Sequence, residues 1–262
     1  MGKDQKVLFN STIFGPIHSR RLGVSLGINL SPNDGKVCSF DCVYCEAGYN
    51  SQGKGSSGFP SRESVKTELE QKLIKMKESG EHLDVITFSG NGEPTLHPDF
   101  PDIIDDVLAL RDKCFPDAKV SVLTNSTKIF SPAVAEALKK ADNNILKLDS
   151  GINETMRLID QPSSPSFTVD KVVDSLKQFS GSGIIQTMIL RGEHEGKKID
   201  NTTQEELDAL IDAYKKIKPR EIMIYSIDRT TPEEKLVKVE KPELEKIGEL
   251  INKETNIPVI IS

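Results

Sequence analysis

The sequence predicts an α/β protein with a mostly parallel sheet, and three observations support that prediction. Short apolar runs alternate with amphipathic segments about six times, which is the pattern of β/α units joined by right-handed crossovers. The length of 262 residues fits one α/β barrel. No internal repeat and no long linker divides the chain, so one domain is the simplest interpretation.

The amino-terminal part sets out the first strand, a loop, a helix and a second strand. Apolar residues over 24–30 predict the first strand, and a Gly- and Ser-rich loop is expected at 50–58. A helix is expected over 62–79, with Ser61 as its N-cap. Its apolar residues recur at the helical spacing, at Val65, Leu69, Leu73 and Met76. A strand over 83–88 leads into the Gly-containing turn 89–93.

The remaining elements continue the alternation. Helices are expected over 102–113, 132–140, 167–179, 203–217 and 240–253, and strands over 119–123, 145–148, 184–190, 221–227 and 257–261. Thr203 and Glu206 have the spacing of a capping box. Polar residues follow several strands, at 89–94, 124–125, 149–150 and 228–229. In parallel α/β sheets ligands bind at these carboxyl ends, so the site is expected there.

Composition narrows the function classes. The net charge is −6 and the sequence pI is about 5.4, which argues weakly against binding nucleic acid through bulk charge. Trp is absent and aromatic residues make up 5%, so a stacking platform for single-stranded nucleic acid is not expected. No apolar run reaches the ~18–20 residues of a membrane span, and residues 1–10 have no signal-peptide core. We therefore expect a cytoplasmic protein.

Three of the four cysteines form a tight cluster. Cys38, Cys42 and Cys45 lie within eight residues, whereas Cys114 is distant. In a reducing compartment such a cluster indicates a metal site, and thiolates select Zn, Cu(I) or iron–sulfur clusters. A structural Zn site would need a distant fourth ligand such as Cys114 or His18. Three thiolates on a four-iron cluster would leave one iron open, where a small molecule can chelate.

These cysteines and a second motif carry a resemblance to a known family. The spacing C-x3-C-x2-C, with Tyr44 before the last cysteine, resembles the signature of the radical S-adenosylmethionine (radical SAM) superfamily. The turn after the next strand, S-G-N-G-E-P-T at 89–95, is similar to the Gly-Gly-Glu motif of that superfamily, with Asn91, Gly92 and Glu93 at its three positions. The segments 14–23 and 227–229 further resemble a short, single-cluster iron–sulfur oxidoreductase group related to tRNA wybutosine synthase.

The resemblance implies a partial (β/α)6 TIM-like barrel with an apolar carboxyl-terminal strand. Residues 1–23 would be a short amino-terminal extension, and 24–262 the radical SAM core domain. It also implies two cofactors, a 4Fe-4S cluster on Cys38, Cys42 and Cys45, and S-adenosylmethionine on the open iron. One electron would cleave S-adenosylmethionine and release a 5′-deoxyadenosyl radical, which abstracts hydrogen from a substrate.

Further residues are expected to bind S-adenosylmethionine. Glu93 suits its methionyl ammonium, with Asn91 beside it and Gly92 allowing close backbone approach. Lys147 and Asp149 alternate along one strand and share a face, so they suit the carboxylate and the ribose hydroxyls. The other candidates lie at the ends of neighbouring strands or beside the cluster: Tyr44, Thr124, Asn125, Ser150, Thr187 and Met188.

Plainer interpretations of these residues remain open. Thr124 and Asn125 could be an ordinary strand exit, and Lys147 with Asp149 a solvated pair on an edge strand. The pairs Arg20–Arg21 and Asp228–Arg229 are either substrate-binding residues or surface charges and ion pairs. Cys114 alone remains outside the motif and suits a buried helical thiol, so the resemblance implies one cluster and no sacrificial sulfur.

Three functions are weighed on this basis. The first is a radical SAM enzyme acting on a small metabolite, peptide or protein, with flavodoxin or ferredoxin as the electron donor that the resemblance implies. The second is tRNA base modification, which needs a basic face that could include Arg20, Arg21, Lys54 and Arg62. The third is a non-enzymatic electron carrier or sensor, which would not cleave S-adenosylmethionine. No membrane partner is expected.

Overall fold

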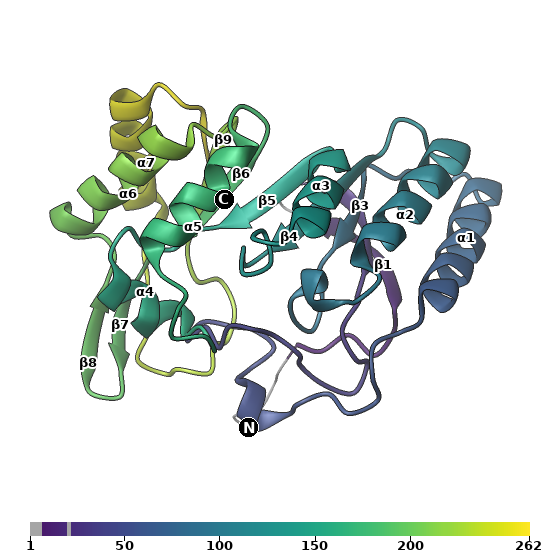
Figure 1. The fold of residues 1–262 in the computed structure, drawn as a ribbon, viewed down its shortest axis with the longest axis horizontal. Coiled ribbons are helices and arrows are strands. Elements are labelled where there is room, and N and C mark those ends of the chain that lie inside the picture. Colours follow the sequence, from purple (N-terminus) through teal and green to yellow (C-terminus); the bar gives the residue numbers. More distant parts are fainter. Residues whose placement is uncertain (1–6, 20–21) are drawn as a thin grey trace.

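The chain folds around one open sheet, as seen in a computed structural model that describes residues 7–19 and 22–262 (Figure 1). Within these ranges the main sheet has eight strands in the order β1-β2-β3-β4-β5-β6-β9-β11. All neighbours pair in parallel except β1 and β2, which form an antiparallel hairpin. The strands are β1 (Ile13–Ser19), β2 (Gly23–Ile28), β3 (Val85–Phe88), β4 (Lys119–Thr124), β5 (Asn143–Lys147), β6 (Ile184–Met188), β9 (Glu221–Tyr225) and β11 (Val259–Ile261).

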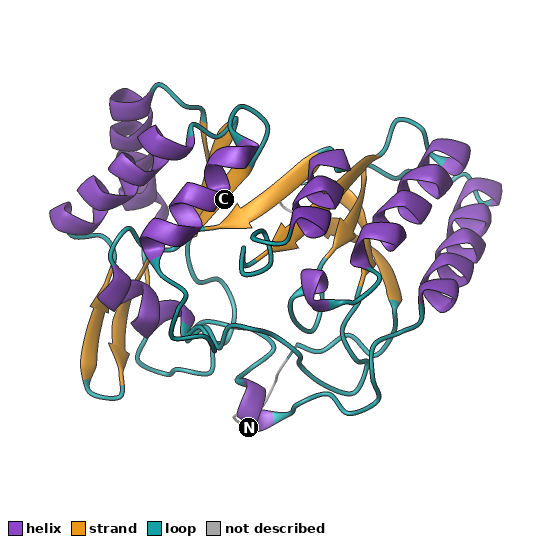
Figure 2. Ribbon diagram, viewed as in Figure 1, coloured by secondary structure: helices purple, strands orange, loops and turns teal. Residues whose placement is uncertain are grey.

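The helices lie along one side of this sheet, and the loops that follow the strands gather at its lower edge in the same view (Figure 2). They are α1 (Arg62–Glu78), α2 (Phe100–Cys114), α3 (Pro132–Lys140), α4 (Asn153–Asp160), α5 (Val169–Leu176), α6 (Gln204–Ile217) and α7 (Lys241–Thr255). This confirms the predicted fold class, a partial barrel, with the sheet left unclosed between β1 and β11. No helix in the described ranges is long and apolar enough to cross a bilayer.

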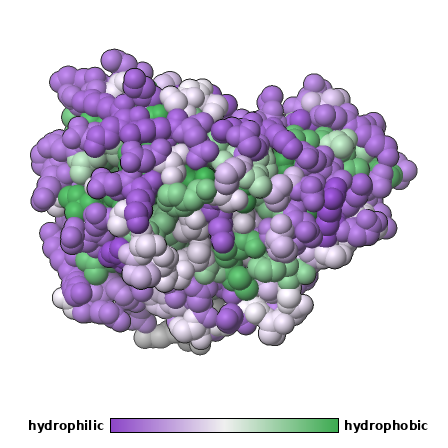
Figure 3. Space-filling view, viewed as in Figure 1, coloured by the Kyte–Doolittle hydropathy of each residue, from purple (hydrophilic) through white to green (hydrophobic). Residues whose placement is uncertain are grey.

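The two faces of the sheet have different chemistry. The outer face and the helices enclose the main core, because α1 buries Val65, Leu69, Leu73 and Met76 at the predicted helical spacing. The inner face carries a second, small apolar cluster of Ile145, Ile184 and Met223, with Leu22 and Leu123 packed against it. Hydrophilic residues cover the helices at both sides of the molecule, and apolar residues gather toward the middle of the face drawn in Figure 3.

The structure differs from the predicted elements in four places. The segment assigned to an amino-terminal extension contributes strand β1, and α4 was not expected because its eight residues are too few to show a period. The expected strand 184–190 ends at Met188, and a new strand β7 (Leu190–His194) begins a hairpin with β8 (Lys197–Asp200). Its turn uses positive φ at Glu195 and Gly196, while polar residues hide the strand pattern. A two-residue strand β10 (Val237–Lys238) pairs with β7.

Candidate active site

The three motif cysteines lie on one loop that follows β2. A hydrogen bond from Cys45 N to Cys42 O, 3.0 Å long, turns the loop back on itself. Cys42 is buried, and Cys38 and Cys45 are partly buried. Burial raises the pKa of Cys38 to about 12 and that of Cys42 well above its usual value. Cys38 and Cys42 therefore keep their protons in the free protein, and a metal must displace those protons on binding.

Lys36 is fully buried beneath this loop and was missed by sequence analysis. Its Nζ donates to Asp41 Oδ1 at 3.0 Å and to Gly48 O at 2.8 Å, so it joins both sides of the cysteine segment. Burial alone would lower the pKa of Lys36, but the three cysteines, once ionised, and the hydrogen bond to Asp41 raise it. A lysine two residues before a cysteine carries no local signal of such contacts.

The cysteine loop is paired directly with the turn after β3. Val37 and Gly92 form a parallel β-bridge, with hydrogen bonds from Val37 N to Asn91 O and from Glu93 N to Val37 O. A Cβ on Gly92 would lie 1.9 Å from Val37 O, so only glycine fits there. The Asn91 carboxamide bonds Phe9 N, Phe9 O and Pro32 O. Gly92 and Asn91 thus hold backbone segments around the loop.

Glu93 is a buried carboxylate surrounded by donors. Its Oε1 accepts hydrogen bonds from the Thr124 hydroxyl at 2.7 Å and from the amide and hydroxyl of Thr95, at 3.1 and 2.5 Å. Its Oε2 accepts from Asn125 N at 2.6 Å. Burial raises the pKa of Glu93, and these hydrogen bonds oppose the rise by stabilising the charged form. The structure therefore brings Glu93, Thr124 and Asn125 together at the ends of β3 and β4.

Asn125 links this carboxylate to the cysteine loop. Its backbone N–H contacts Glu93, while its side-chain Nδ2 lies 3.5 Å from Cys38 Sγ and 3.0 Å from Ser39 Oγ. The Asn125 Oδ1 accepts from both the amide and the hydroxyl of Thr127. The two sequence motifs therefore meet through one residue.

Lys147 and Asp149 point to the inner face from the end of β5. Lys147 Nζ lies 3.0 Å from Asp149 Oδ2, and the Tyr44 hydroxyl bonds both groups. The ammonium also lies 4.7 Å from the centre of the Tyr44 ring. Although burial would lower it, the Asp149 carboxylate raises the pKa of Lys147 well above its usual value. Lys147 is 15% and Asp149 0% exposed, so this is a buried pair and not a solvated one.

The cysteine loop also contacts Asp160, a neighbour of Asp149. Cys42 Sγ lies 3.4 Å from Asp160 Oδ1 at the end of α4. Burial and the nearby Asp149 raise the pKa of Asp160 well above its usual value. Asp160 was not predicted, because α4 itself was not.

Two predicted residues lie elsewhere. Thr187 precedes Met188 on β6, so its side chain faces outward and bonds Leu148 O and the Tyr214 hydroxyl of α6. The Ser150 hydroxyl is also turned toward α6 and bonds Glu206 Oε2 at 2.7 Å. Met188, by contrast, lines a cavity at the inner edge of the sheet.

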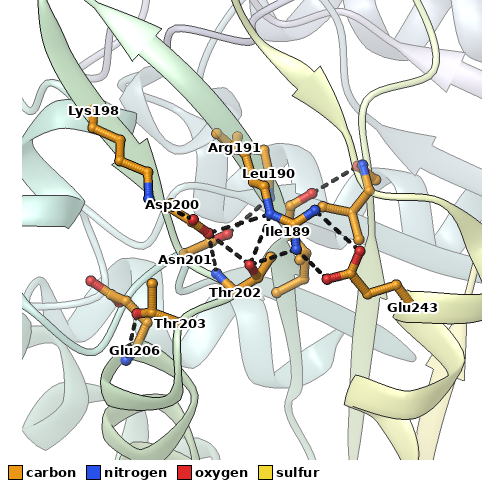
Figure 4. Close-up of polar contacts among 12 residues, drawn as sticks. Ile189, Leu190, Arg191, Lys198, Asp200, Asn201, Thr202, Thr203, Glu206 and Glu243 are labelled. Carbon is orange, nitrogen blue, oxygen red and sulfur yellow. Dashed lines mark hydrogen bonds and ion pairs between the residues drawn. The ribbon is translucent and has the colours of Figure 1, made fainter.

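Asn201 fixes the strand ends that carry Asp149 and Met188. It is fully buried, and its Nδ2 donates to the carbonyls of those two residues at 2.8 and 2.7 Å. Its Oδ1 accepts from Leu190 N at 2.8 Å. Beside it, Arg191 reaches from β7 to Thr202 and to Glu243 of α7 (Figure 4). Asn201 lies in the turn after β8, where an isolated Asn gives no sign of this role.

The residues proposed to complete a Zn site lie at the opposite end of the sheet. Cys114 ends α2, just before β4 begins at Lys119. His18 pairs with Val24 at the start of β2. Across residues 7–19 and 22–262, no three His, Cys, Asp or Glu side chains are arranged to hold a single ion.

Two adjoining cavities open beside the cysteine loop. One has a volume of about 200 Å³ and is lined by Tyr44, Cys45, Met188 and Tyr225. The other, of about 460 Å³, lies on the inner face of the sheet. They share a rim of Glu46, Asp228 and Arg229, in which Arg229 Nη1 lies 2.6 Å from Glu46 Oε2. Asp228 lies 3.3 Å from Lys238 Nζ. Arg20 and Arg21 lie outside the described residues.

Comparison with known families defines the class of protein. The radical SAM superfamily matches residues 33–197, a range that contains both motifs. The chain therefore belongs to the radical SAM superfamily, and its cofactors are a 4Fe-4S cluster and S-adenosylmethionine.

Three curated relatives show how much of the chain is shared with other proteins. A UPF0026 protein of Synechocystis is 30% identical over 84% of the chain and 77% of its own length, and one of Methanocaldococcus jannaschii is 35% identical over 68% and 53%. A Brachyspira hyodysenteriae protein named GTPase Obg is 33% identical over 93% of the chain. The chain spans 34% of the Brachyspira protein and about half of the Methanocaldococcus one.

Solved structures share the fold. A radical SAM methyltransferase from Sphaerobacter thermophilus has a TM-score of 0.67 at 11% identity, covering 91% of this chain and 65% of its own. TYW1 with a lysine-pyruvate adduct has a TM-score of 0.60 at 15% identity, covering 87% and 73%. Streptococcus suis SuiB bound to S-adenosylmethionine has a TM-score of 0.60 at 17% identity, covering 91% and 47%.

Proposed function

We propose that this radical SAM enzyme generates a 5′-deoxyadenosyl radical that abstracts hydrogen from a small substrate held on the inner face of the sheet. The observation that carries the proposal is the junction at Asn125, which contacts Glu93 through its backbone and Cys38 through its side chain. This places a buried carboxylate beside a loop of three thiols. An acceptor for an ammonium group therefore lies next to ligands for iron.

The cysteine loop fits the cluster. Cys38, Cys42 and Cys45 lie on one loop, and each of them, once ionised, helps to raise the pKa of the buried Lys36. Thiolates are the ligands of iron–sulfur clusters, and three of them leave one of four irons open. We assign the cluster to these three cysteines, with Lys36 offsetting part of their negative charge.

Other residues of the site would hold S-adenosylmethionine. Glu93 accepts the methionyl ammonium, with Thr124 and Asn125 orienting its carboxylate. Lys147 and Asp149 bind the methionyl carboxylate and the ribose hydroxyls, and Tyr44 and Met188 border the cavity that would take the adenine. A cluster held by Cys38, Cys42 and Cys45 would, when reduced, supply the electron for cleaving S-adenosylmethionine into methionine and the radical. Asn91 and Gly92 act through the backbone that they position, and Ser150 and Thr187 are left out because they face α6.

Reductive cleavage of S-adenosylmethionine tests the proposal. The anaerobically reconstituted protein, given dithionite and S-adenosylmethionine, is expected to release 5′-deoxyadenosine. Cys42→Ala should lose the visible iron–sulfur absorbance and this product, while the matched variant Cys114→Ala keeps both. Full absorbance in Cys42→Ala would reject the ligand assignment. A cluster-loaded wild type that forms no 5′-deoxyadenosine would favour an electron carrier or sensor instead.

The alternative of tRNA modification has less support. Of the basic residues expected on such a face, Arg62 is engaged by Asp102 and Asp106, at 3.3 and 2.6 Å. A shift of bulk tRNA with this protein at low salt, weakened as salt rises, would support it. No shift at low salt would end it. An electron donor of the flavodoxin or ferredoxin type is proposed on the requirement for a reductant alone.

A further inference from the structure

The inner face of the sheet contains a chamber that the proposed cofactor residues do not fill. It has a volume of about 460 Å³, within the range of small-molecule sites. Residues from seven strands line it, from β1 to β9. It meets the smaller cavity beside Tyr44 and Cys45 along their shared rim. A molecule in the chamber would therefore lie next to the proposed adenosine position.

Gln186 is the unusual residue of this chamber. It lies in the middle of β6, is 8% exposed, and lines the cavity. Among the residues that the structure describes, its carboxamide has no hydrogen-bond partner. The nearby hydroxyls of Ser25 and Thr87 satisfy each other at 2.9 Å. Gln186 is not among the residues whose polar side-chain atoms are both buried and unpaired, so its carboxamide faces the open space of the chamber, where a ligand can bond it.

The walls around Gln186 define what that ligand can be. Its strand neighbour Met223, together with Leu123 and Ile145, forms an apolar surround. Among the described lining residues, Glu46, Asp228 and Arg229 come from loops and lie at the rim, where Arg229 already pairs with Glu46. The inner part of this described lining has no carboxylate, lysine or arginine, so a charged group there would lose hydration without gaining an opposite charge from it. A neutral group with a flat, apolar face suits these walls.

We propose that the substrate presents to Gln186 a neutral, planar group with an adjacent hydrogen-bond donor and acceptor, as in a carboxamide or the edge of a nucleobase. The carboxamide of Gln offers one acceptor and two donors, which match such an edge with two parallel hydrogen bonds. This inference rests on the proposed function, because it places the group beneath the radical source. It makes Gln186 a specificity-determining residue.

Binding of defined probes tests this inference in the holoenzyme saturated with S-adenosylmethionine. Equilibrium dialysis under anaerobic conditions measures labelled cytidine, nicotinamide and ribitol. Cytidine or nicotinamide should bind, and ribitol, which lacks a planar donor–acceptor edge, should not. Gln186→Leu should weaken binding at least tenfold. Binding of cytidine alone identifies a nucleobase edge, and binding of nicotinamide identifies a carboxamide.

A stability measurement separates this role from a structural one. Gln186→Leu should leave the Tm of the free protein unchanged or raised, because it removes no hydrogen bond between described residues and adds an apolar side chain beside Met223. The matched control is Gln178→Leu, whose carboxamide bonds Ile129 O and Ser175 O outside the chamber. It should lower the Tm and leave probe binding intact.

Three results would overturn the inference: no binding of cytidine or nicotinamide, equal binding of ribitol, or full binding by Gln186→Leu. Release of 5′-deoxyadenosine by the same wild-type sample is measured in parallel. If that product forms while no probe binds, the inference fails and the proposed function stands. If it does not form, the proposed function fails on its own evidence.

Discussion

The backbone amide of Asn125 donates a 2.6 Å hydrogen bond to Oε2 of Glu93, and so joins the end of β4 to the turn after β3. The same carboxylate accepts three further bonds from Thr95 and Thr124, all of them from neutral donors. These donors favour the charged form of Glu93, and no described cation pairs with it directly. Its carboxylate is therefore free of an ionic partner among the described residues and can accept a cationic ligand.

Glu93→Gln should abolish most of the affinity for S-adenosylmethionine while leaving the cluster in place. The amide cannot accept four hydrogen bonds in the same geometry and has no charge to offer an ammonium. Loss of a charged hydrogen bond of ~1.5–3 kcal/mol corresponds to a roughly 10- to 150-fold weaker Kd for S-adenosylmethionine. Isothermal titration calorimetry measures the change, with iron content as the control. An unchanged Kd would remove Glu93 from the site.

The same carboxylate should make cofactor binding depend on pH. Burial raises the pKa of Glu93 in the folded protein, so protonation begins at a higher pH than in the unfolded chain. Affinity for S-adenosylmethionine should fall as the pH decreases through this raised pKa. The contribution of Glu93 to the free energy of unfolding should instead increase as the pH decreases, because the folded state binds a proton on Glu93 at a higher pH than the unfolded chain does. Wild type and Glu93→Gln compared across mildly acidic pH give the test: a dependence that persists in the variant belongs to another group.

Lys36→Met should weaken both the fold of the loop and its capacity for iron. The variant leaves the Gly48 carbonyl and the half-buried Asp41 carboxylate without their ammonium donor. We expect a loss of about 1–3 kcal/mol in the free energy of unfolding, measured with urea. Iron bound after reconstitution should fall as well. Lys54→Met is the control, because Lys54 pairs with Lys36 only through the backbone bridge and its side chain is exposed. Equal behaviour of the two variants would contradict the role of Lys36.

Gly92→Ala should block the seating of the cysteine loop. The new Cβ would overlap Val37 O, which is a backbone atom and cannot rotate away. We expect a loss of iron incorporation and a destabilisation of more than ~1 kcal/mol. Gly80→Ala, at the end of α1, meets no atom within 4 Å although its φ is +69°. It should retain its iron; a Gly92→Ala protein with full iron content would show that the loop can shift.

Asn201→Leu should destabilise the protein through the ends of β5 and β6. The substitution leaves the carbonyls of Asp149 and Met188 and the amide of Leu190 without their partner in a buried setting. A loss of ~2–4 kcal/mol in the free energy of unfolding is expected. Asn143→Leu serves as the control, since the Asn143 side chain is only partly buried. If both variants lose the same free energy, Asn201 has no special place in the site.

Local sequence patterns predict the fold class and part of the arrangement of the site. The alternation of strands and helices gave the fold class, and period-two alternation correctly put Lys147 and Asp149 on one face. The same rule turns the side chain of Thr187 away from the face that carries its neighbour Met188. The roles of the three cysteines and of Glu93 remain predictions.

The residues that were missed depend on tertiary contacts. Lys36 and Asn201 contact segments that lie 5–12 and 11–52 positions away in the chain, and no short pattern marks them. Gly92 was expected to allow close backbone approach, and Val37 O is the backbone atom that lies against it in the structure. Strand β1 escaped notice because its inward and outward residues do not alternate cleanly in polarity.

The unclosed sheet has a kinetic consequence. The chamber extends to Ile17 and His18, which are exposed on the edge strand β1, so it opens sideways as well as toward the cysteine loop. A substrate that enters along β1 does not have to pass the position proposed for S-adenosylmethionine. The two ligands should then bind in random order, and neither should be required for the other to enter or leave.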